Sequence, residues 1–278
     1  MKFTFENAKY SIGPGNDRTL SRKINDYKFK VNMVKENKNL FGVVLAFWDE
    51  YLNFKDIPNK WEVVIITHNP TSWIPENEFF ITEFPDSWIV ISVHDNYVQE
   101  IRALIGEKWY DFEILKSRFE QLTRWEAKIL GPVVTMSIKG FDKLLPMSPN
   151  AIRLEPEDEK KFHDFMESCT DSEAKEVNME FGNPTHFFYA LYQEWIIVSL
   201  ANYSVDDKNR IGHIWIITPF RFSWKGYGKQ LVNTVIRQII DSWLAPQYRA
   251  SSTNIASLKI AESLWFERVL ESFSFIPA

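Results

Sequence analysis

Residues 211–229 read IGHIWIITPFRFSWKGYGK, and this stretch decides the fold of the C-terminal half. Its apolar, β-branched start predicts a strand over 211–218, which Pro219 ends. Two glycines, Gly226 and Gly228, follow in a short loop. Apolar residues then recur at helical spacing from Leu231 to Trp243, which predicts a long amphipathic helix. A glycine loop that leads into a helix N-terminus suits a phosphate or pyrophosphate group.

The glycine spacing limits which phosphate-binding motif this can be. A Gly-x-Gly alone is also typical of a tight turn. The spacing Gly-x-x-x-x-Gly-Lys-Ser/Thr of nucleotide-binding loops is absent, and the third glycine of the dinucleotide fingerprint would fall on Leu231. A nucleotide is therefore a weaker interpretation of this loop.

The flanking sequence predicts alternating strands and helices around this loop. The order from 149 to 278 is β-α-β-β-β-α-β-α-β, which indicates an α/β or α+β domain with a mixed sheet. The expected strands are Ala151–Leu154, Phe187–Tyr192, Trp195–Tyr203, Ile211–Thr218, a segment after Pro246, and Val269–Ile276; the other expected helices are Glu157–Cys169 and Ile255–Leu264.

The N-terminal half carries a second mixed α/β pattern. Residues Asp142–Asn150, rich in Pro and Ser, predict a linker, so we expect domains at 1–148 and 149–278. The expected elements before the linker are a helix from Leu40 to Tyr51, strands Trp61–Thr67, Trp88–His94 and Pro132–Ile138, and helices Asp95–Ile105 and Tyr110–Ile129.

Composition excludes several classes of function. The chain has 278 residues, 45% of them hydrophobic, and a net charge of −5, which argues against non-specific binding of nucleic acid or an anionic membrane. The single cysteine, Cys169, excludes an internal disulfide. The five histidines show no metal-ligand spacing, so we expect no metal. Without a signal-like start or an apolar run long enough to span a bilayer, the sequence suggests a cytoplasmic protein.

Two blocks of sequence together resemble a known family. A strand, Thr-Pro, a basic and polar stretch, Gly-x-Gly and a long helix resemble the acyl-CoA site of the GNAT superfamily of N-acyltransferases. The run 246–266, with Asn254 at the start of a helix, is similar to that family's last strand and helix. The resemblance covers only the C-terminal domain, 149–278. It leaves open whether residues 1–148 form a degenerate second copy of the same fold or an unrelated lid or oligomerisation domain.

This resemblance implies acetyl-CoA, or another short acyl-CoA, as co-substrate. The strand edge would bind pantetheine, the loop would hold the pyrophosphate, and the last helix would flank the thioester. The residues implied for these roles are Ile216, Ile217, Thr218, Ser223, Trp224, Lys225, Gly226, Tyr227, Gly228, Lys229, Asn254 and Ser257.

The sequence departs from the family pattern at three positions. Ser223 stands where the family has Arg or Gln, although Arg221 and Lys225 lie close by. Trp265 replaces the glycine of a Gly-Phe pair, and Ala261 replaces a tyrosine that protonates the leaving thiolate. The general acid is therefore not identified by the motif.

The implied reaction is direct attack of a primary amine on a thioester, for which a general base is useful because alkylamines are protonated at pH 7. His213 is the candidate base, and Tyr248 or Ser251 the candidate acid. Glu176 and Glu180 are candidates for binding the substrate amine. His213, Glu176 and Glu180 have a plain structural interpretation as well, and water is the alternative to Tyr248 or Ser251 as the acid.

Three further points stay open at the level of sequence. The acceptor could be an amino acid, a polyamine, an antibiotic, a peptide N-terminus or a protein lysine, and a homodimer is compatible with the pattern. The alternative to an enzyme is a non-catalytic module that binds acyl-CoA or keeps the fold and works through protein partners.

Overall fold

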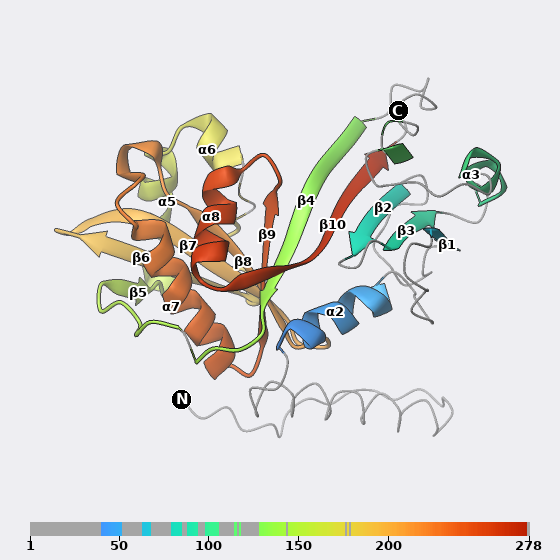
Figure 1. Cartoon of the computed structure of the whole chain (residues 1–278). Helices are drawn as coiled ribbons and strands as arrows, with labels where there is room; N and C mark the ends of the chain where they lie inside the picture. The colour runs from blue at the N-terminus through green and yellow to red at the C-terminus, as the bar shows by residue number, and fades with distance from the viewer. Residues whose placement is uncertain are drawn as a thin grey trace, which may run out of the picture.

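The computed structural model describes residues 40–51, 63–67, 79–84, 88–93, 98–105, 114–115, 117, 128–142, 144–175, 177 and 179–276. Within them, strands form a single 10-stranded sheet in the order β1-β3-β2-β10-β4-β9-β8-β7-β6-β5 (Figure 1). The pairs β1–β3 and β8–β9 run parallel and the other pairs antiparallel, so the expected mixed-sheet class is confirmed. The strands are β1 Val63–Thr67, β2 Phe79–Phe84, β3 Trp88–Val93, β4 Lys128–Ile138, β5 Ala151–Arg153, β6 His186–Gln193, β7 Ile196–Asp206, β8 Ile211–Ile217, β9 Ala245–Ser251 and β10 Phe266–Ile276.

The helices follow the order that the sequence predicts after residue 149, with one short helix added. They are α2 Leu40–Tyr51, α3 Val98–Ile105, α5 Glu159–Glu167, α6 Asp171–Lys175, α7 Tyr227–Asp241 and α8 Ile255–Ser263, with 3-10 turns η2 Pro156–Asp158 and η3 Phe220–Phe222. The added helix is α6. It lies on the segment that leads from α5 towards β6.

Helix α7 covers one face of the sheet, and α8 lies beside it (Figure 1). The apolar stripe of α7 includes Leu231, Val235 and Ile239. It is fully buried against β6, β7 and β8, as the helical spacing predicts. Each such side chain contributes about 1.5–3 kcal/mol through burial. This packing fixes the N-terminus of α7 next to the end of β8.

The opposite face of the sheet carries α5 and α2. Phe162 and Phe165 of α5 pack on Phe188, Leu200 and Ile217. Helix α2 packs against β9, β4 and β10. An element of the N-terminal half therefore contacts strands of the C-terminal half.

Two sequence expectations about the N-terminal half need correction. The helix expected over Tyr110–Ile129 is wrong at its end, because Lys128 and Ile129 belong to β4 and pair with Ile276 and Phe275 of β10. Strand β2 was not anticipated. It lies between β3 and β10, and such long-range pairing leaves no local signal.

The expected linker lies along α7. The Leu145 N–H donates to Asn233 Oδ1 at 3.1 Å, and the Ser148 N–H donates to Thr234 Oγ1 at 3.0 Å. Strand β4, which precedes this segment, pairs with β9 and β10, which follow it. One sheet thus spans residue 148, and the division into domains at 148/149 stays a prediction.

Candidate active site

Strands β8 and β9 pair along only part of their length. The parallel register runs from Ile211 opposite Ala245 to Ile214 opposite Tyr248. Beyond this point β8 stays paired with β7 as far as Ile217, and β9 stays paired with β4 as far as Ser251. The edge of β8 over 215–217 that faces β9 has no partner strand among the described residues. Such an edge can accept an extended ligand as an added strand would.

The loop after β8 leads into the N-terminus of α7. Gly226 is the residue before the helix and has φ +78°, a left-handed conformation that favours glycine. The Gln230 N–H donates to the Gly226 carbonyl at 3.1 Å and closes the first turn, so the N–H groups before it have no partner within the helix. A Cβ on Gly228 would lie 2.9 Å from Ile260 Cδ1 and 3.1 Å from Thr218 Oγ1. Glycine therefore keeps space open between β8, α7 and α8.

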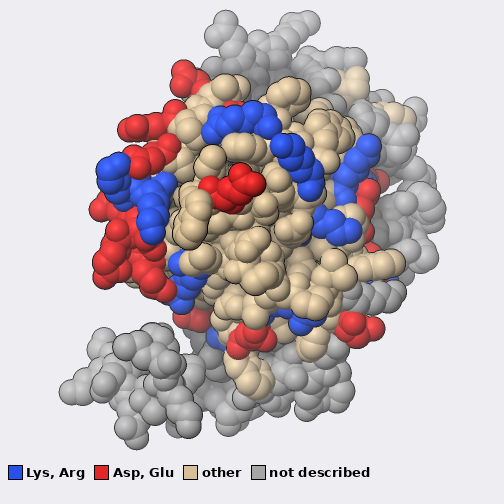
Figure 2. All heavy atoms as spheres, turned by 90° about the vertical axis from the view of Figure 1, so that its left-hand side faces the viewer, with Lys and Arg blue, Asp and Glu red and all other residues tan. Residues whose placement is uncertain are grey.

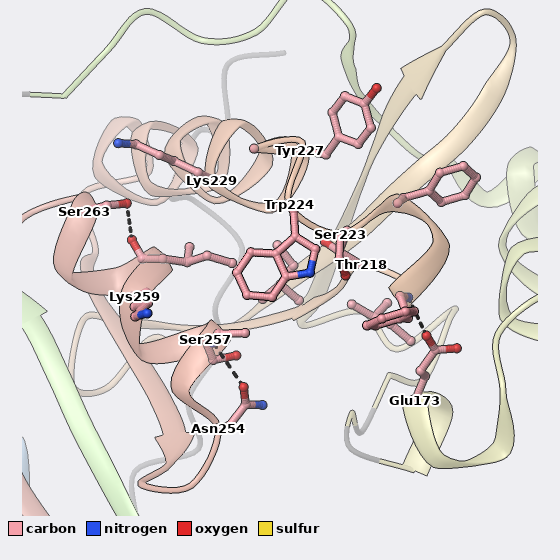
Figure 3. Close-up of a pocket in the computed structure, with 18 of the residues that line it drawn as sticks. Glu173, Thr218, Ser223, Trp224, Tyr227, Lys229, Asn254, Ser257, Lys259 and Ser263 are labelled. Atoms are coloured by element: carbon pink, nitrogen blue, oxygen red, sulfur yellow. Dashed lines mark hydrogen bonds between the residues drawn. The ribbon is translucent and has the colours of Figure 1, made fainter.

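Helix α8 forms the third wall. Asn254 caps it, because its Oδ1 accepts the Ser257 N–H at 3.1 Å. A cavity of about 580 Å³ lies between this helix, the end of β8 and the loop (Figure 3). The expected ligand-binding residues that line it are Ile216, Ile217, Thr218, Ser223, Trp224, Gly226, Tyr227, Gly228, Lys229, Asn254 and Ser257; Lys225 is not among the lining residues.

Several lining residues were missed by sequence reasoning, and Glu173 of α6 is the most informative. Its Oε1 accepts the Phe220 N–H at 2.6 Å, and its Oε2 accepts the Thr170 N–H at 2.7 Å. These hydrogen bonds lower the pKa of the Glu173 carboxyl, and the bond from Phe220 has the largest effect. The carboxylate thus fastens the loop after β8 to α6. Its partner is 47 residues away, so no local spacing could reveal it.

Lysines provide the positive charge at the cavity. Lys229 comes from α7 and Lys259 from α8, and Figure 3 shows both on the same side of the site as Ser263. Arg221, which the sequence placed near the loop, turns away instead. Its guanidinium donates to the Ser168 carbonyl and to Ser168 Oγ at the end of α5.

Trp224 lines the cavity and is 88% exposed. Its backbone has φ +66°, a conformation that costs a non-glycine residue about 1–2 kcal/mol. Figure 3 shows the ring in front of the cavity, between α8 and the end of β8. A large apolar ring that stays in solvent next to a cavity offers a stacking surface for a planar group.

Tyr248 and Ser251, the two candidate acids, lie on opposite faces of β9, because residues three apart on a strand point to opposite sides. Tyr248 is buried next to Phe266, and its hydroxyl faces the Ser257 side chain. Burial raises the pKa of Tyr248 to about 12, and the nearby Ser257 side chain partly opposes the shift. Ser251 Oγ lies 2.8 Å from Thr253 Oγ1 and does not line the cavity. Tyr248 does not line the cavity either, but its hydroxyl lies next to Ser257, which does.

His213, the candidate base, lies on β8 opposite Gln247 of β9 and outside the cavity lining. Its Nδ1 is 2.8 Å from Gln247 Nε2. Burial lowers its pKa to about 4; the Arg249 charge acts in the same direction and Asp206 opposes it. The imidazole is therefore neutral at pH 7.

Of the two candidate amine-binding carboxylates, only Glu180 belongs to the described part of the chain. Glu180 is exposed, lies near His186 and does not line the cavity. Glu176 lies outside the described residues.

The structure shows the surroundings of two positions at which the sequence departs from the family pattern, Trp265 and Ala261. Trp265, at the expected glycine position, follows α8 with φ +66°, which explains why glycine suits this place. Ala261 is fully buried in the core, so a tyrosine there would need a different packing.

Comparison with known proteins gives matches among solved structures only. No family model matches the sequence, and no curated protein does. A putative GNAT-family acetyltransferase from Novosphingobium aromaticivorans is 14% identical, with 55% of this chain and 68% of that chain covered and a TM-score of 0.42. A GNAT-family acetyltransferase from Colwellia psychrerythraea is 10% identical, with 85% and 97% covered and a TM-score of 0.48. An aminoglycoside N-acetyltransferase in complex with CoA is 15% identical, with 43% and 92% covered and a TM-score of 0.35. At these identities the likeness concerns the path of the chain and not its activity.

Surface and membrane features add little to the site. Among the described residues, no helix combines the length and apolar character needed to cross a membrane. On the face shown in Figure 2, Lys and Arg lie mainly around a largely uncharged centre, and Asp and Glu are densest along the left flank, with smaller acidic groups near the upper centre and the lower rim. This face therefore does not present a continuous basic field.

Proposed function

We propose that this protein is an acyl-CoA-dependent N-acyltransferase that moves an acetyl or other short acyl group to a primary amine. One observation carries the proposal. The unpaired edge of β8, the N-terminus of α7 and the capped start of α8 meet at a single cavity. The strand edge suits an amide-containing arm, and the helix N-terminus suits a pyrophosphate.

In the proposed binding mode, residues 216–218 hydrogen-bond the pantetheine arm. The backbone of 224–229 surrounds the pyrophosphate, and Lys229 of α7 contributes a positive charge to the cavity lining. Ser257, which lines the cavity near buried Tyr248, then lies at the thioester end. The family resemblance of the two sequence blocks supports the same order of contacts.

The proposed reaction transfers an acyl group from the sulfur of CoA to the nitrogen of an amine. The neutral amine nitrogen attacks the thioester carbonyl carbon, a C–N bond forms and the C–S bond breaks. The amine loses a proton to a base or to water, and the leaving thiolate takes one, which gives an amide and a free thiol. Tyr248 keeps its proton at pH 7, and its hydroxyl lies next to Ser257 of the cavity lining, so we propose it as the donor to the thiolate.

A non-catalytic acyl-CoA-binding module is the second candidate. The observation that favours it is Ala261, a buried residue with no acid at the family's tyrosine position. The two candidates share the binding site and differ in turnover. Release of free thiol in the presence of amines distinguishes them.

The first test is calorimetric titration with acetyl-CoA of the parent, of Gly226→Asp and of Gly182→Asp. Both glycines have positive φ, +78° and +88°, and open space where a Cβ would lie, but only Gly226 lines the cavity. The backbone strain is thus matched. We expect Gly226→Asp to lose at least about tenfold in affinity, because a carboxylate opposes the pyrophosphate, and Gly182→Asp to bind like the parent.

The outcome directs the next step. If the parent and Gly182→Asp bind acetyl-CoA and Gly226→Asp does not, the next step is a screen for thiol release. The amines to test are amino acids, polyamines, aminoglycoside-type antibiotics, peptides and protein lysines. If folded parent protein binds neither acetyl-CoA, longer acyl-CoAs nor CoA, the proposed function is wrong.

A further inference from the structure

A chain of hydrogen bonds connects α2 to His213. The Trp48 Nε1–H donates to Gln247 Oε1 at 3.0 Å, and Gln247 Nε2 lies 2.8 Å from His213 Nδ1. Trp48 belongs to the N-terminal half, 199 residues from Gln247 in the sequence. The chain therefore couples an element of that half to a strand that borders the cavity.

The direction of each bond follows from the donor at its start. An indole N–H can only donate, so the oxygen of the Gln247 amide must face Trp48. The amide NH₂ then faces His213 and must donate, which leaves Nδ1 of the imidazole as the acceptor. A neutral imidazole carries one proton. In this arrangement the proton is on Nε2.

The surroundings hold this arrangement in place. Gln247 is fully buried and Trp48 is 3% exposed, so water cannot readily replace either bond. The Arg249 guanidinium stacks on the Trp48 ring at 5.5 Å, and the Phe47 ring meets the imidazole edge-to-face at 6.0 Å. Among described residues, Arg249 and Asp206 are the charged groups that act on His213. Neither takes the place of Gln247 at Nδ1.

We propose that Trp48, acting through Gln247, is a positioning residue that fixes His213 as its Nε2–H tautomer and so makes it a neutral hydrogen-bond donor. The lone pair of the ring is on Nδ1 and already engaged. His213 cannot then act as a general base without first exchanging its tautomer. Helix α2 thereby sets the hydrogen-bonding state of a side chain on β8, the strand whose C-terminal end borders the cavity. This inference does not depend on acyl transfer.

The test is the tautomer of His213 read from the two imidazole nitrogens by NMR of protein labelled with ¹⁵N-histidine, at pH 7. The His213→Gln variant assigns the signal. The parent should show a protonated Nε2 and an unprotonated Nδ1. Trp48→Phe keeps a ring but removes the donor, so the amide can turn over and a mixture of both tautomers is expected.

Two further variants separate hydrogen bonding from packing. Phe47→Leu alters the contact of α2 with the imidazole but leaves the indole donor, and it should keep the single Nε2–H tautomer. Gln247→Glu offers only acceptors to both neighbours, so His213 should invert to Nδ1–H and its pKa should rise. Circular dichroism confirms that each variant is folded.

The outcomes decide the proposal. An Nδ1–H tautomer in the parent overturns it, and this measurement needs no variant to fold. A single Nε2–H tautomer in folded Trp48→Phe also overturns it, as does equal mixing in Phe47→Leu and Trp48→Phe. Loss of acetyl-CoA binding would leave all of these tautomer results readable, so failure of the proposed function is distinguishable.

Discussion

The Glu173 carboxylate accepts the backbone N–H of Phe220 at 2.6 Å and thereby ties α6 to the loop that follows β8. The same carboxylate accepts the Thr170 N–H, so it bridges two backbone segments. Because Glu173 and Phe220 both line the cavity, this bond sets the position of one wall. The loop before α7 is thus held by a residue that the sequence motif does not contain.

Glu173→Gln should weaken acetyl-CoA binding by about three- to tenfold, because a neutral amide accepts a weaker hydrogen bond than a carboxylate. Glu167→Gln, an exposed carboxylate at the end of α5, is the control. Calorimetry measures both affinities. Equal affinity of parent and Glu173→Gln would show that the loop does not need this tie.

Trp224 offers a second, independent test of the cavity mouth. Trp224→Ala should lower affinity for acetyl-CoA about three- to tenfold, as expected for loss of one stacking contact. Trp195→Ala is the matched control, since Trp195 also has positive φ, +75°, and is 96% exposed, but lies in the β6–β7 turn away from the cavity. The two variants are compared by calorimetry, and quenching of the parent's fluorescence on titration supports the assignment. Similar losses in both would count against a stacking role.

Asn233 provides a stability prediction for the segment between the expected domains. Its buried side chain accepts the Leu145 N–H and donates to the Leu145 and Pro146 carbonyls. Asn233→Ala should lower the free energy of unfolding by about 2–4 kcal/mol, since partners of a buried group are left unsatisfied. Asn183→Ala, which removes only contacts within its own turn, should cost no more than about 1 kcal/mol. Urea unfolding measures both, and equal costs would show that the segment is not anchored by α7.

The sequence predicts the structure best where the signals are local. The strand, Gly226, Gly228 and the apolar stripe of α7 are all contiguous, and the cavity forms around them. Asn254 is also a local signal, because a helix cap acts within one turn.

The missed features depend on residues far apart in the chain. Lys128 and Ile129 fit a helical pattern but join β4 because β10 is available as a partner. Glu173 reaches Phe220, and Trp48 reaches Gln247, across long separations that leave no periodicity. His213 could be named from its strand, whereas its tautomer and neutrality follow only from what packs around it.

The low pKa of His213 predicts how stability depends on pH. Its folded-state pKa is about 4, whereas the unfolded chain has the ordinary histidine value of about 6.5. Between these values the unfolded state binds more protons than the folded state, so stability rises as pH increases from 4 to 6.5 and this contribution levels off above about 7. The difference corresponds to roughly 3 kcal/mol at most. The pKa of partly buried His186 is also lowered by desolvation, which adds to the slope in the same direction.

His213→Gln should reduce the slope of unfolding free energy against pH by up to one proton in this window, measured by urea unfolding at several pH values. An unchanged slope in a folded variant would mean that His213 titrates as it does in the unfolded chain.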